Sequence, residues 1–379
     1  MDEKAVALAI PVFFLLIGIE LVVLRLRGPA RAYRFSDSIT NLSCGVGQQV
    51  LEPFLKGVAL LPYAWLWTHA RLFTVSAASP LAWLALVLGV DLGYYAWHRA
   101  SHRIGFLWAV HAVHHQSEEY NLSVALRQPW LESFTAPFFY LPLAVMGFPP
   151  VMYLAGVTID TLYQFWIHTR TVKRLGPLEW FMNTPSHHRV HHGIDPEYVD
   201  RNYGGIFIFW DRLFRTFRRE EREPVYGTVK PLGTWGPLSA NLAVWKDLAK
   251  ISRATRSWKD KLRVWFAPPE WRPADLGGPV VVPPADPAAH PRYDVRAPTR
   301  VQVYVLVQFA IAAVATMAYL WSESTASPAF LAIGAAVLVA TVVAWGGLLE
   351  GRRWAWPLEV TRLAAGVALV AVPISQLIP

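Results

Sequence analysis

The histidines are the residues of this chain whose spacing most clearly indicates chemistry. Ten of the twelve fall between positions 98 and 192, and eight of these form three short groups. The groups are His98-x3-His102, His111-x2-His114-His115 and His188-x2-His191-His192. An α-helix repeats every 3.6 residues, so side chains three or four positions apart lie on one face. Each group therefore predicts a helix that presents two or three imidazoles together.

This set of imidazoles predicts a metal centre. Neutral imidazoles with no cysteine nearby suit borderline divalent metals, and zinc usually stops at four ligands. Eight or more imidazoles therefore indicate two metal ions that share one cage. A single H-x3-H pattern would more often be a surface or core feature, but three groups in a chain with few other histidines indicate a site. The predicted ligands are His98, His102, His111, His114, His115, His168, His187, His188, His191 and His192.

Two of these predicted ligands lie outside the three groups. His187 directly precedes the third group. His168 follows Gln164 by four residues at the end of an apolar stretch, where an isolated histidine can be a hydrogen-bonded core residue. Its spacing and depth favour a ligand or a close neighbour of the metals, and we include it on that ground.

Composition places these histidines in a membrane protein. Hydrophobic residues make up 54% of the chain and charged residues 16%, below the roughly 25% usual for soluble domains. The formal net charge of +8 has no accompanying nucleic-acid motif, so we expect no nucleic-acid partner. Basic loops on the cytoplasmic face of a membrane explain the excess better. Cys44 is the only cysteine, which excludes an internal disulfide framework.

Apolar stretches long enough to cross a bilayer recur along the chain. They predict spans at 5–24, 41–68, 81–97, 131–167 (as two helices), 301–321, 329–349 and 358–378. Arginines 25, 27, 31 and 34 follow the first span, and by the positive-inside tendency that loop is cytoplasmic. With eight spans, the arginine-rich loops and all the histidine groups fall on the cytoplasmic side. The predicted fold is an all-α integral membrane protein, a multi-span helical bundle with a cytoplasmic, histidine-rich helical cap.

Polar residues near the histidine groups are candidates to orient the ligands or to take part in catalysis. Asp91 lies within a predicted span, seven residues before His98, and an intramembrane carboxylate is usually functional. An ion pair or a helix end is the alternative for Asp91, and we favour support of a histidine. Each of the other candidates could equally be an ordinary loop or cap residue. The full set is Asp91, Glu118, Asn121, Asp160, Asp200 and Asn202.

Taken together, the three groups resemble the fatty acid hydroxylase/sterol desaturase superfamily of integral-membrane di-metal oxygenases. The superfamily pattern is H-x3-4-H, H-x2-3-H-H and H-x2-3-H-H, and the resemblance covers roughly residues 30–230. As a three-part set the motif is highly specific. Within the superfamily, five stretches look most like the alkylglycerol monooxygenase branch: 121–128, 163–169, 183–193, 202–204 and 210–214.

That branch uses iron, O2 and a tetrahydropterin to hydroxylate the ether-linked carbon of glyceryl ethers. The resemblance therefore implies two iron ions, which zinc can displace during purification, and a membrane lipid as substrate. The glutamate that this branch carries after its second histidine group is associated with the pterin and matches Glu118, the expected cofactor-binding residue. Other branches carry a further H-x3-H where this chain has Gln164-x3-His168, so an amide can replace one ligand here.

We therefore expect a membrane-bound, non-haem di-iron monooxygenase that hydroxylates a lipid C–H bond with O2 and takes electrons from a pterin or a redox protein. A sterol or fatty acyl desaturase or hydroxylase with a protein electron donor is the alternative within the superfamily. From other classes, a membrane haem protein would need single facing histidines rather than clusters. A metal transporter would place ionisable residues along a path through the midplane.

The expected organisation has four parts. Residues 1–80 form N-terminal membrane helices and residues 81–230 the di-metal core. Residues 231–298 form a cytoplasmic amphipathic segment and linker, and residues 299–379 a C-terminal block of three spans. The last block lies outside the resemblance, and the sequence assigns it no role.

Overall fold

A computed structural model describes residues 3–27, 32–285, 290 and 292–371. Over these residues the chain is all-helical, as predicted, with thirteen α-helices, five short 3-10 helices and no strand beyond two isolated β-bridges. The α-helices are α1 (Glu3–Arg27), α2 (Phe35–Ala70), α3 (Pro80–Arg103), α4 (Gly105–His115), α5 (Leu141–Val145), α6 (Pro150–Trp166), α7 (Pro185–His191), α8 (Phe209–Leu213), α9 (Pro237–Ala254), α10 (Trp258–Phe266), α11 (Thr299–Ser322), α12 (Pro328–Leu349) and α13 (Ala355–Ala371). The 3-10 helices are η1 (Val124–Leu126), η2 (Glu132–Phe134), η3 (Ala136–Tyr140), η4 (Gly176–Trp180) and η5 (Ala274–Leu276).

Four helices among the described residues are long and apolar enough to cross a membrane: Ala7–Arg27, Pro80–Arg103, Thr299–Ser322 and Pro328–Leu349. They correspond to four of the predicted spans. Residues 41–68 lie within α2, a 36-residue helix that does not belong to these four. The predicted span 358–378 begins in α13, but its residues 372–378 lie outside the described part of the chain. The side of the membrane on which the histidines lie stays a prediction.

The expectation of two long helices in 131–167 is half wrong. The second half is the 17-residue helix α6, but the first half consists of η2, η3 and the five-residue α5. Pro137 and Pro142 lie in this first half, and proline donates no backbone hydrogen bond to continue a helix. Gly147 then takes φ +97°, which ends α5 before α6 begins.

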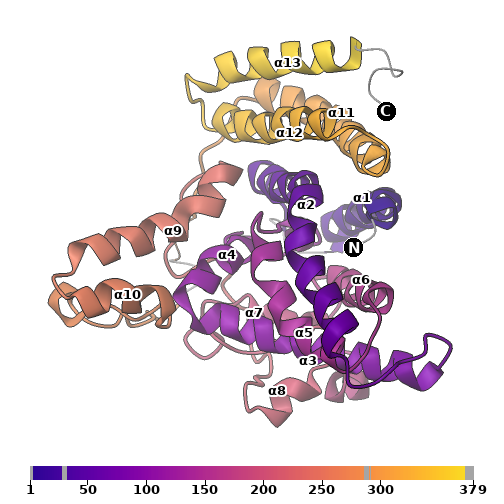
Figure 1. The fold of residues 1–379 in the computed structure, drawn as a ribbon. Coiled ribbons are helices and arrows are strands. Elements are labelled where there is room, and N and C mark those ends of the chain that lie inside the picture. The colour runs from indigo at the N-terminus through magenta and orange to yellow at the C-terminus, as the bar shows by residue number, and fades with distance from the viewer. Residues whose placement is uncertain (1–2, 28–31, 286–289, 291, 372–379) are drawn as a thin grey trace.

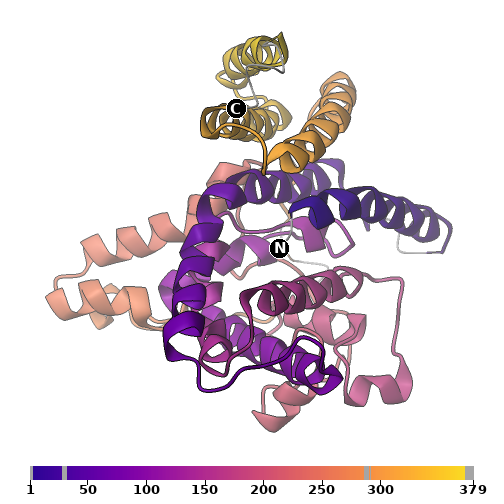
Figure 2. The ribbon, with the colours of Figure 1, turned by 45° about the vertical axis from the view of Figure 1, so that its right-hand side comes forward.

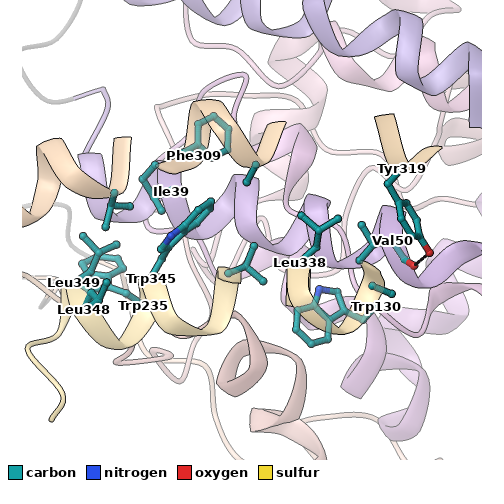
Figure 3. Close-up of a cluster of buried hydrophobic side chains, with 14 of the residues drawn as sticks. Ile39, Val50, Trp130, Trp235, Phe309, Tyr319, Leu338, Trp345, Leu348 and Leu349 are labelled. Carbon is teal, nitrogen blue, oxygen red and sulfur yellow. Dashed lines mark hydrogen bonds between the residues drawn. The ribbon is translucent and has the colours of Figure 1, made fainter. Parts of the chain in front are cut away.

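The C-terminal helices pack against α2, and Figure 3 shows the cluster of apolar side chains between them. Trp345 of α12 is fully buried beside Phe309 of α11. Tyr319 of α11 donates a hydrogen bond to the Val50 carbonyl of α2 at 3.0 Å. Because α11 and α12 are helices of membrane-spanning length, van der Waals packing and hydrogen bonds stabilise such contacts, rather than the removal of apolar surface from water. The C-terminal block is therefore docked onto the helix that leads to the histidine-bearing part of the chain.

The helices α9 and α10 form a hairpin that projects from one side of the molecule in both views (Figures 1 and 2). Its end is fixed to the start of α4, because the Gly105 N–H donates to the Ala267 carbonyl at 2.9 Å. A Cβ at Gly105 would lie 2.7 Å from the Val264 carbonyl oxygen, so only glycine allows this approach. The hairpin thereby fixes the first turn of the helix that carries the second histidine group.

Candidate metal centre

Four segments carry the histidines to one place. Helix α3 carries His98 and His102, and α4 carries the second group. The third group lies on α7 and its C-cap, and His168 follows α6 by two residues. Figure 1 shows α3, α4, α6 and α7 in the same part of the molecule. Nine of the ten predicted ligands meet there, and all nine are buried.

The nine histidines divide into two groups, which we call the five-histidine group and the four-histidine group. In each, one ring nitrogen from every member lies within 4.8 Å of those of all the others. The five-histidine group is His98, His102, His111, His115 and His191, and the four-histidine group is His114, His168, His188 and His192. The groups adjoin, with the rings of His115 and His192 stacked at 4.4 Å. Each group could hold one metal ion, as the sequence predicts.

Hydrogen bonds to the backbone settle which nitrogen each anchored histidine presents. In the five-histidine group, His98 Nδ1 lies 2.8 Å from the Tyr203 carbonyl, and His191 Nδ1 lies 2.9 Å from the Arg201 carbonyl. A carbonyl oxygen can only accept, so both Nδ1 atoms carry the proton and both Nε2 atoms carry a lone pair. These Nε2 atoms, like that of His102, are buried and have no partner among the described residues. An inward-facing lone pair with a carbonyl behind the ring is the usual arrangement of a metal-binding histidine.

The four-histidine group gives a stronger indication of a bound metal ion. His114 Nδ1 lies 3.2 Å from the Arg127 carbonyl, and His168 Nδ1 lies 2.7 Å from the Gln164 carbonyl. Both Nε2 atoms of these neutral rings therefore carry lone pairs, yet they lie only 3.1 Å apart. That contact is not a hydrogen bond, because neither atom has a proton to give. Two ligands that each lie about 2.0–2.1 Å from one metal ion would be separated by about 3 Å, so a cation between them accounts for the contact.

Burial keeps these imidazoles neutral. The pKa of His114 is lowered to about 4, because its ring is removed from water. Burial and neighbouring histidines lower the pKa values of His188, His191 and His192 well below the usual range. At neutral pH these rings hold no extra proton, which is the state that binds a metal.

The tenth predicted ligand, His187, belongs to neither group. Its ring packs edge-on against Phe217 at 5.5 Å, and its Nδ1 lies 3.5 Å from Thr184 Oγ1. The side-chain amide of Gln164 donates to Asp160 Oδ2 at 2.7 Å, while its backbone carbonyl accepts from His168. Gln164 therefore positions His168 through its backbone, and a ligand role for its side-chain oxygen stays a prediction.

The two candidate asparagines lie in loops that shape the site. Asn202, at φ +55°, donates to the His187 carbonyl at 3.0 Å and the Arg218 carbonyl at 2.8 Å. It thereby holds the loop whose Arg201 carbonyl accepts from a histidine. Asn121 donates to the Ala32 carbonyl at 2.8 Å, and its side-chain oxygen accepts from Ser123 Oγ at 2.6 Å. Its contacts support the loop that follows α4.

Arg127 is not among the candidates named from the sequence, and it is 1% exposed. Its carbonyl accepts from His114, and its guanidinium donates to the Val113 carbonyl at 2.6 Å, Asn41 Oδ1 at 3.0 Å and Gln116 Oε1 at 3.1 Å. A charged side chain with this many partners fixes its own backbone. Asp200, a candidate from the sequence, lies 3.5 Å from His102 Nδ1.

Asp91 and Asp160 lie close together beside the site, since a Cβ at Gly205 would lie 2.8 Å from Oδ1 of each. Asp91 accepts from Ile206 N at 2.5 Å, Phe207 N at 3.1 Å and Trp210 Nε1 at 2.9 Å. These three donors suit an ionised Asp91, whereas Asp160 Oδ1 is buried and has no partner among the described residues. We infer that Asp160 carries a proton, which removes the repulsion between the two carboxyl groups, and that Asp91 clamps the loop behind His98.

This pair leads to an asymmetric expectation for two conservative variants. Asp160→Asn should keep metal content and the unfolding temperature, because its amide can donate to Asp91 as the protonated carboxyl does. Asp91→Asn should lower both, because its amide would face backbone donors, and each buried unsatisfied donor costs about 1–3 kcal/mol. Thermal unfolding and metal analysis of both variants check this. Equal effects in the two variants would contradict the assignment of the proton.

An apolar cavity of about 990 Å³ adjoins the histidines. His111, His114 and His168 line one part of its wall. Apolar side chains of α1, α2, α6 and α11 line much of the remainder, including Phe14 and Phe309, whose rings meet edge-on at 5.6 Å. The C-terminal block therefore forms part of the cavity wall through α11.

Comparisons with known proteins identify the family. Residues 83–216 match the family model described as fatty acid hydroxylase. The chain is 36% identical over 361 residues to the alkylglycerol monooxygenase of Homo sapiens, and this match covers 93% of the present chain and 80% of the human protein. It is 34% identical over 352 residues to the alkylglycerol monooxygenase of Xenopus tropicalis, with 92% and 78% covered. A shorter match relates the chain to the ornithine lipid hydroxylase OlsE of Rhizobium tropici. The two are 29% identical over 140 residues, which cover 37% of this chain and 42% of OlsE. No solved structure matches significantly.

The histidine groups, the apolar cavity and the helices of spanning length define a class, membrane proteins with a candidate metal centre beside an apolar cavity. The chain belongs to the fatty acid hydroxylase family. The family and these relatives support a lipid hydroxylase.

Proposed function

We propose that the protein is a non-haem di-iron monooxygenase that hydroxylates a lipid C–H bond with O2, with the ether-linked carbon of alkylglycerols as the favoured position. The main support is the pair of adjacent histidine groups with lone pairs directed inward. Each group would hold one iron ion, and bound iron would supply the redox chemistry that activates O2. In the net reaction, a C–H bond, O2, two electrons and two protons give an alcohol and water.

The chain's own residues would orient the ligands and bind the lipid. The carbonyls of Tyr203, Arg201, Arg127 and Gln164 fix four imidazole rings in one tautomer. The apolar wall would hold an alkyl chain and exclude water, and metals held by the histidine groups would lie beside it, because His111, His114 and His168 line the cavity. The close clustering disfavours haem, which takes single axial histidines. We further propose that the site faces the cytoplasm.

The experiment is turnover of a 1-O-alkylglycerol by the iron-loaded protein in lipid nanodiscs. One arm supplies a tetrahydropterin and the other a ferredoxin or cytochrome donor. We expect O2-dependent loss of the ether with the pterin. Activity with the protein donor alone would assign the chain to a hydroxylase or desaturase of the wider superfamily. Zinc-loaded protein, which imidazole ligands also permit, is the inactive control.

Glu118 is the proposed contact of the pterin, and its surroundings are consistent with a role separate from the metals. Its Oε2 accepts from Arg34 Nη2 at 2.9 Å and from the Tyr293 N–H at 3.0 Å. No histidine is among its described hydrogen-bond partners. Arg34 also lies over the Trp235 ring at 5.5 Å. The carboxylate thus lies in a polar and aromatic corner near the end of α4, where the N–H groups of a pterin could be accepted.

Glu118→Ala should lose pterin-dependent activity by more than about tenfold while it keeps both metals, because it removes a charged acceptor worth about 1.5–3 kcal/mol. The pterin-dependent activity of Glu118→Gln, which keeps one oxygen acceptor, should lie between that of the wild type and that of Glu118→Ala. Activity with each donor and metal content are measured together. Loss of metal with a parallel loss of activity with every donor would show instead that Glu118 only supports the fold.

A further inference from the structure

The hairpin of α9 and α10 carries an apolar stripe on its outer face. The stripe lies on α10, where Trp258 is 80% exposed, Leu262 69% and Phe266 65%. Successive residues of a helix are rotated by about 100°, so these three side chains, four positions apart, fall within an arc of about 80°. The Phe266 ring meets the Phe106 ring of α4 edge-on at 5.6 Å. Large apolar side chains gathered on one exposed face indicate a contact with a membrane or with another protein.

The inner side of the hairpin already has its own apolar core. Leu248 of α9 and Val264 of α10 are buried together with Ala109 of α4. The rings of Trp245 and Trp265 lie 6.2 Å apart in the same cluster. The hairpin is therefore held against α4 without the stripe, and the stripe is left for a partner.

Basic side chains surround the stripe. Residues 237–266 include seven basic and two acidic residues, which gives a net charge of +5. One of the two acids, Asp247, is ion-paired with Lys230 outside the hairpin at 2.5 Å. Lys259 and Arg263 are exposed, and each follows a member of the stripe by one position, so both lie along its edge. The other exposed basic residues of the hairpin are Lys246, Lys250, Arg253 and Arg256. An apolar face bordered by lysine and arginine is typical of helices that lie in the surface of an anionic membrane.

Both ends of the hairpin are attached where candidate spanning helices end. Helix α12 is followed by Glu350, which accepts from the Trp235 N–H at 2.6 Å, two residues before α9 begins. Helix α3 ends two residues before Gly105, whose N–H donates to the carbonyl of Ala267, directly after α10. A helix that crosses a bilayer ends near the headgroup layer. The base of the hairpin, which both views show beside α4 (Figures 1 and 2), therefore lies at the level of a membrane surface.

We propose that the outer face of this hairpin docks onto an anionic lipid surface, with Trp258 and Leu262 in the headgroup layer and the basic side chains against the anionic groups of the lipids. Tryptophan suits this layer because its ring is apolar and its N–H can donate a hydrogen bond. The positive charge alone would also suit an acidic protein, but the apolar stripe and the attachment to the ends of two spanning helices favour the lipid. The inference concerns the outside of the hairpin and does not rest on the proposed function.

The test places a dye on the stripe of the full-length protein. Cys44 is the only cysteine and is buried, so a thiol-reactive, environment-sensitive dye labels a Leu262→Cys variant at the new site. The labelled protein is reconstituted in nanodiscs of phosphatidylcholine, with and without phosphatidylserine. Quenching by a lipid-borne nitroxide and by aqueous iodide reports where the dye lies. We expect blue-shifted emission, with a ratio of lipid quenching to iodide quenching that rises when phosphatidylserine is present.

Charge variants of the labelled protein test the anionic contact. Each basic residue near an anionic surface contributes roughly fivefold to binding. Lys250→Gln with Lys259→Gln should therefore lower the quenching ratio in phosphatidylserine nanodiscs by at least about threefold. Lys173→Gln with Arg219→Gln neutralises two exposed charges outside the hairpin and should leave the ratio unchanged.

An apolar variant tests the stripe itself. Trp258→Ser should lower the quenching ratio in both kinds of nanodisc, because it removes the most exposed ring of the stripe. Unfolding temperature and metal content identify the variants that remain folded.

Three outcomes would overturn the proposal. Iodide quenching without lipid quenching in both nanodiscs would place the stripe in water, and protection that appears only when an acidic redox protein is added would assign the face to that protein. Protection from both quenchers would mean that another protein chain covers the stripe. Equal lipid quenching in the two nanodiscs, unchanged in the lysine variant, would show that the hairpin does not recognise anionic lipid.

Discussion

His168→Ala and His191→Ala are each expected to lose lipid turnover by more than about 100-fold and to lose metal from one histidine group. The reason is that His168 belongs to the four-histidine group and His191 to the five-histidine group. Loss of a partner behind a ligand already costs 10–100-fold in affinity or activity, and loss of the ligand itself should cost more. Metal per folded chain and initial rates with an ether lipid check both variants.

Two matched histidine variants control this experiment. His187 is buried beside the ligands but belongs to neither group, so His187→Ala should keep both metals. His69 is exposed at the end of α2, and His69→Ala should be silent. Full activity in His168→Ala or His191→Ala would refute the assignment, and so would metal loss in His187→Ala alone.

Removal of the metals should lower the unfolding temperature by more than about 10 °C. The facing lone pairs of His114 and His168, 3.1 Å apart, would then repel each other inside a buried site. Structural metal sites contribute about 10–16 kcal/mol in small domains, and each kcal/mol shifts the unfolding temperature by about 2–4 °C in larger ones. Calorimetry of the chelated protein in nanodiscs measures the change.

Iron or zinc should restore the unfolding temperature, whereas magnesium should not, because it prefers oxygen ligands. The His114→Ala variant removes one of the two facing lone pairs, so chelation should destabilise it less than the wild type. An unfolding temperature that does not respond to chelation would mean that the histidine groups are satisfied without metal.

The spacing of the histidines predicted which of them lie together, because helical spacing is a local property. On α4, His111 and His115 lie one turn apart on the same face. His114 is rotated about 100° around the helix axis from His115. That rotation is why His114 joins the other group. The same geometry explains why His187, which precedes His188 by one residue, points elsewhere and belongs to neither group.

Contacts between distant segments could not be read from spacing. The carbonyl of Tyr203 supports His98 across 105 residues, and that of Arg127 supports His114 only because the loop after α4 folds back. The apolar content of 131–149 predicted a helix, although its prolines break it into short turns. The sequence assigned no role to the C-terminal block. In the structure, α11 of this block places Phe309 in the cavity wall.

The central claim is that the two histidine groups hold two metal ions, and metal analysis of the purified, folded protein tests it most directly. Elemental analysis by mass spectrometry, with the protein measured by amino-acid analysis, should give two ions per chain, iron in active samples and zinc in displaced ones. The variants His168→Ala and His191→Ala should each give about one. A value of one or none in folded wild-type protein would contradict the account.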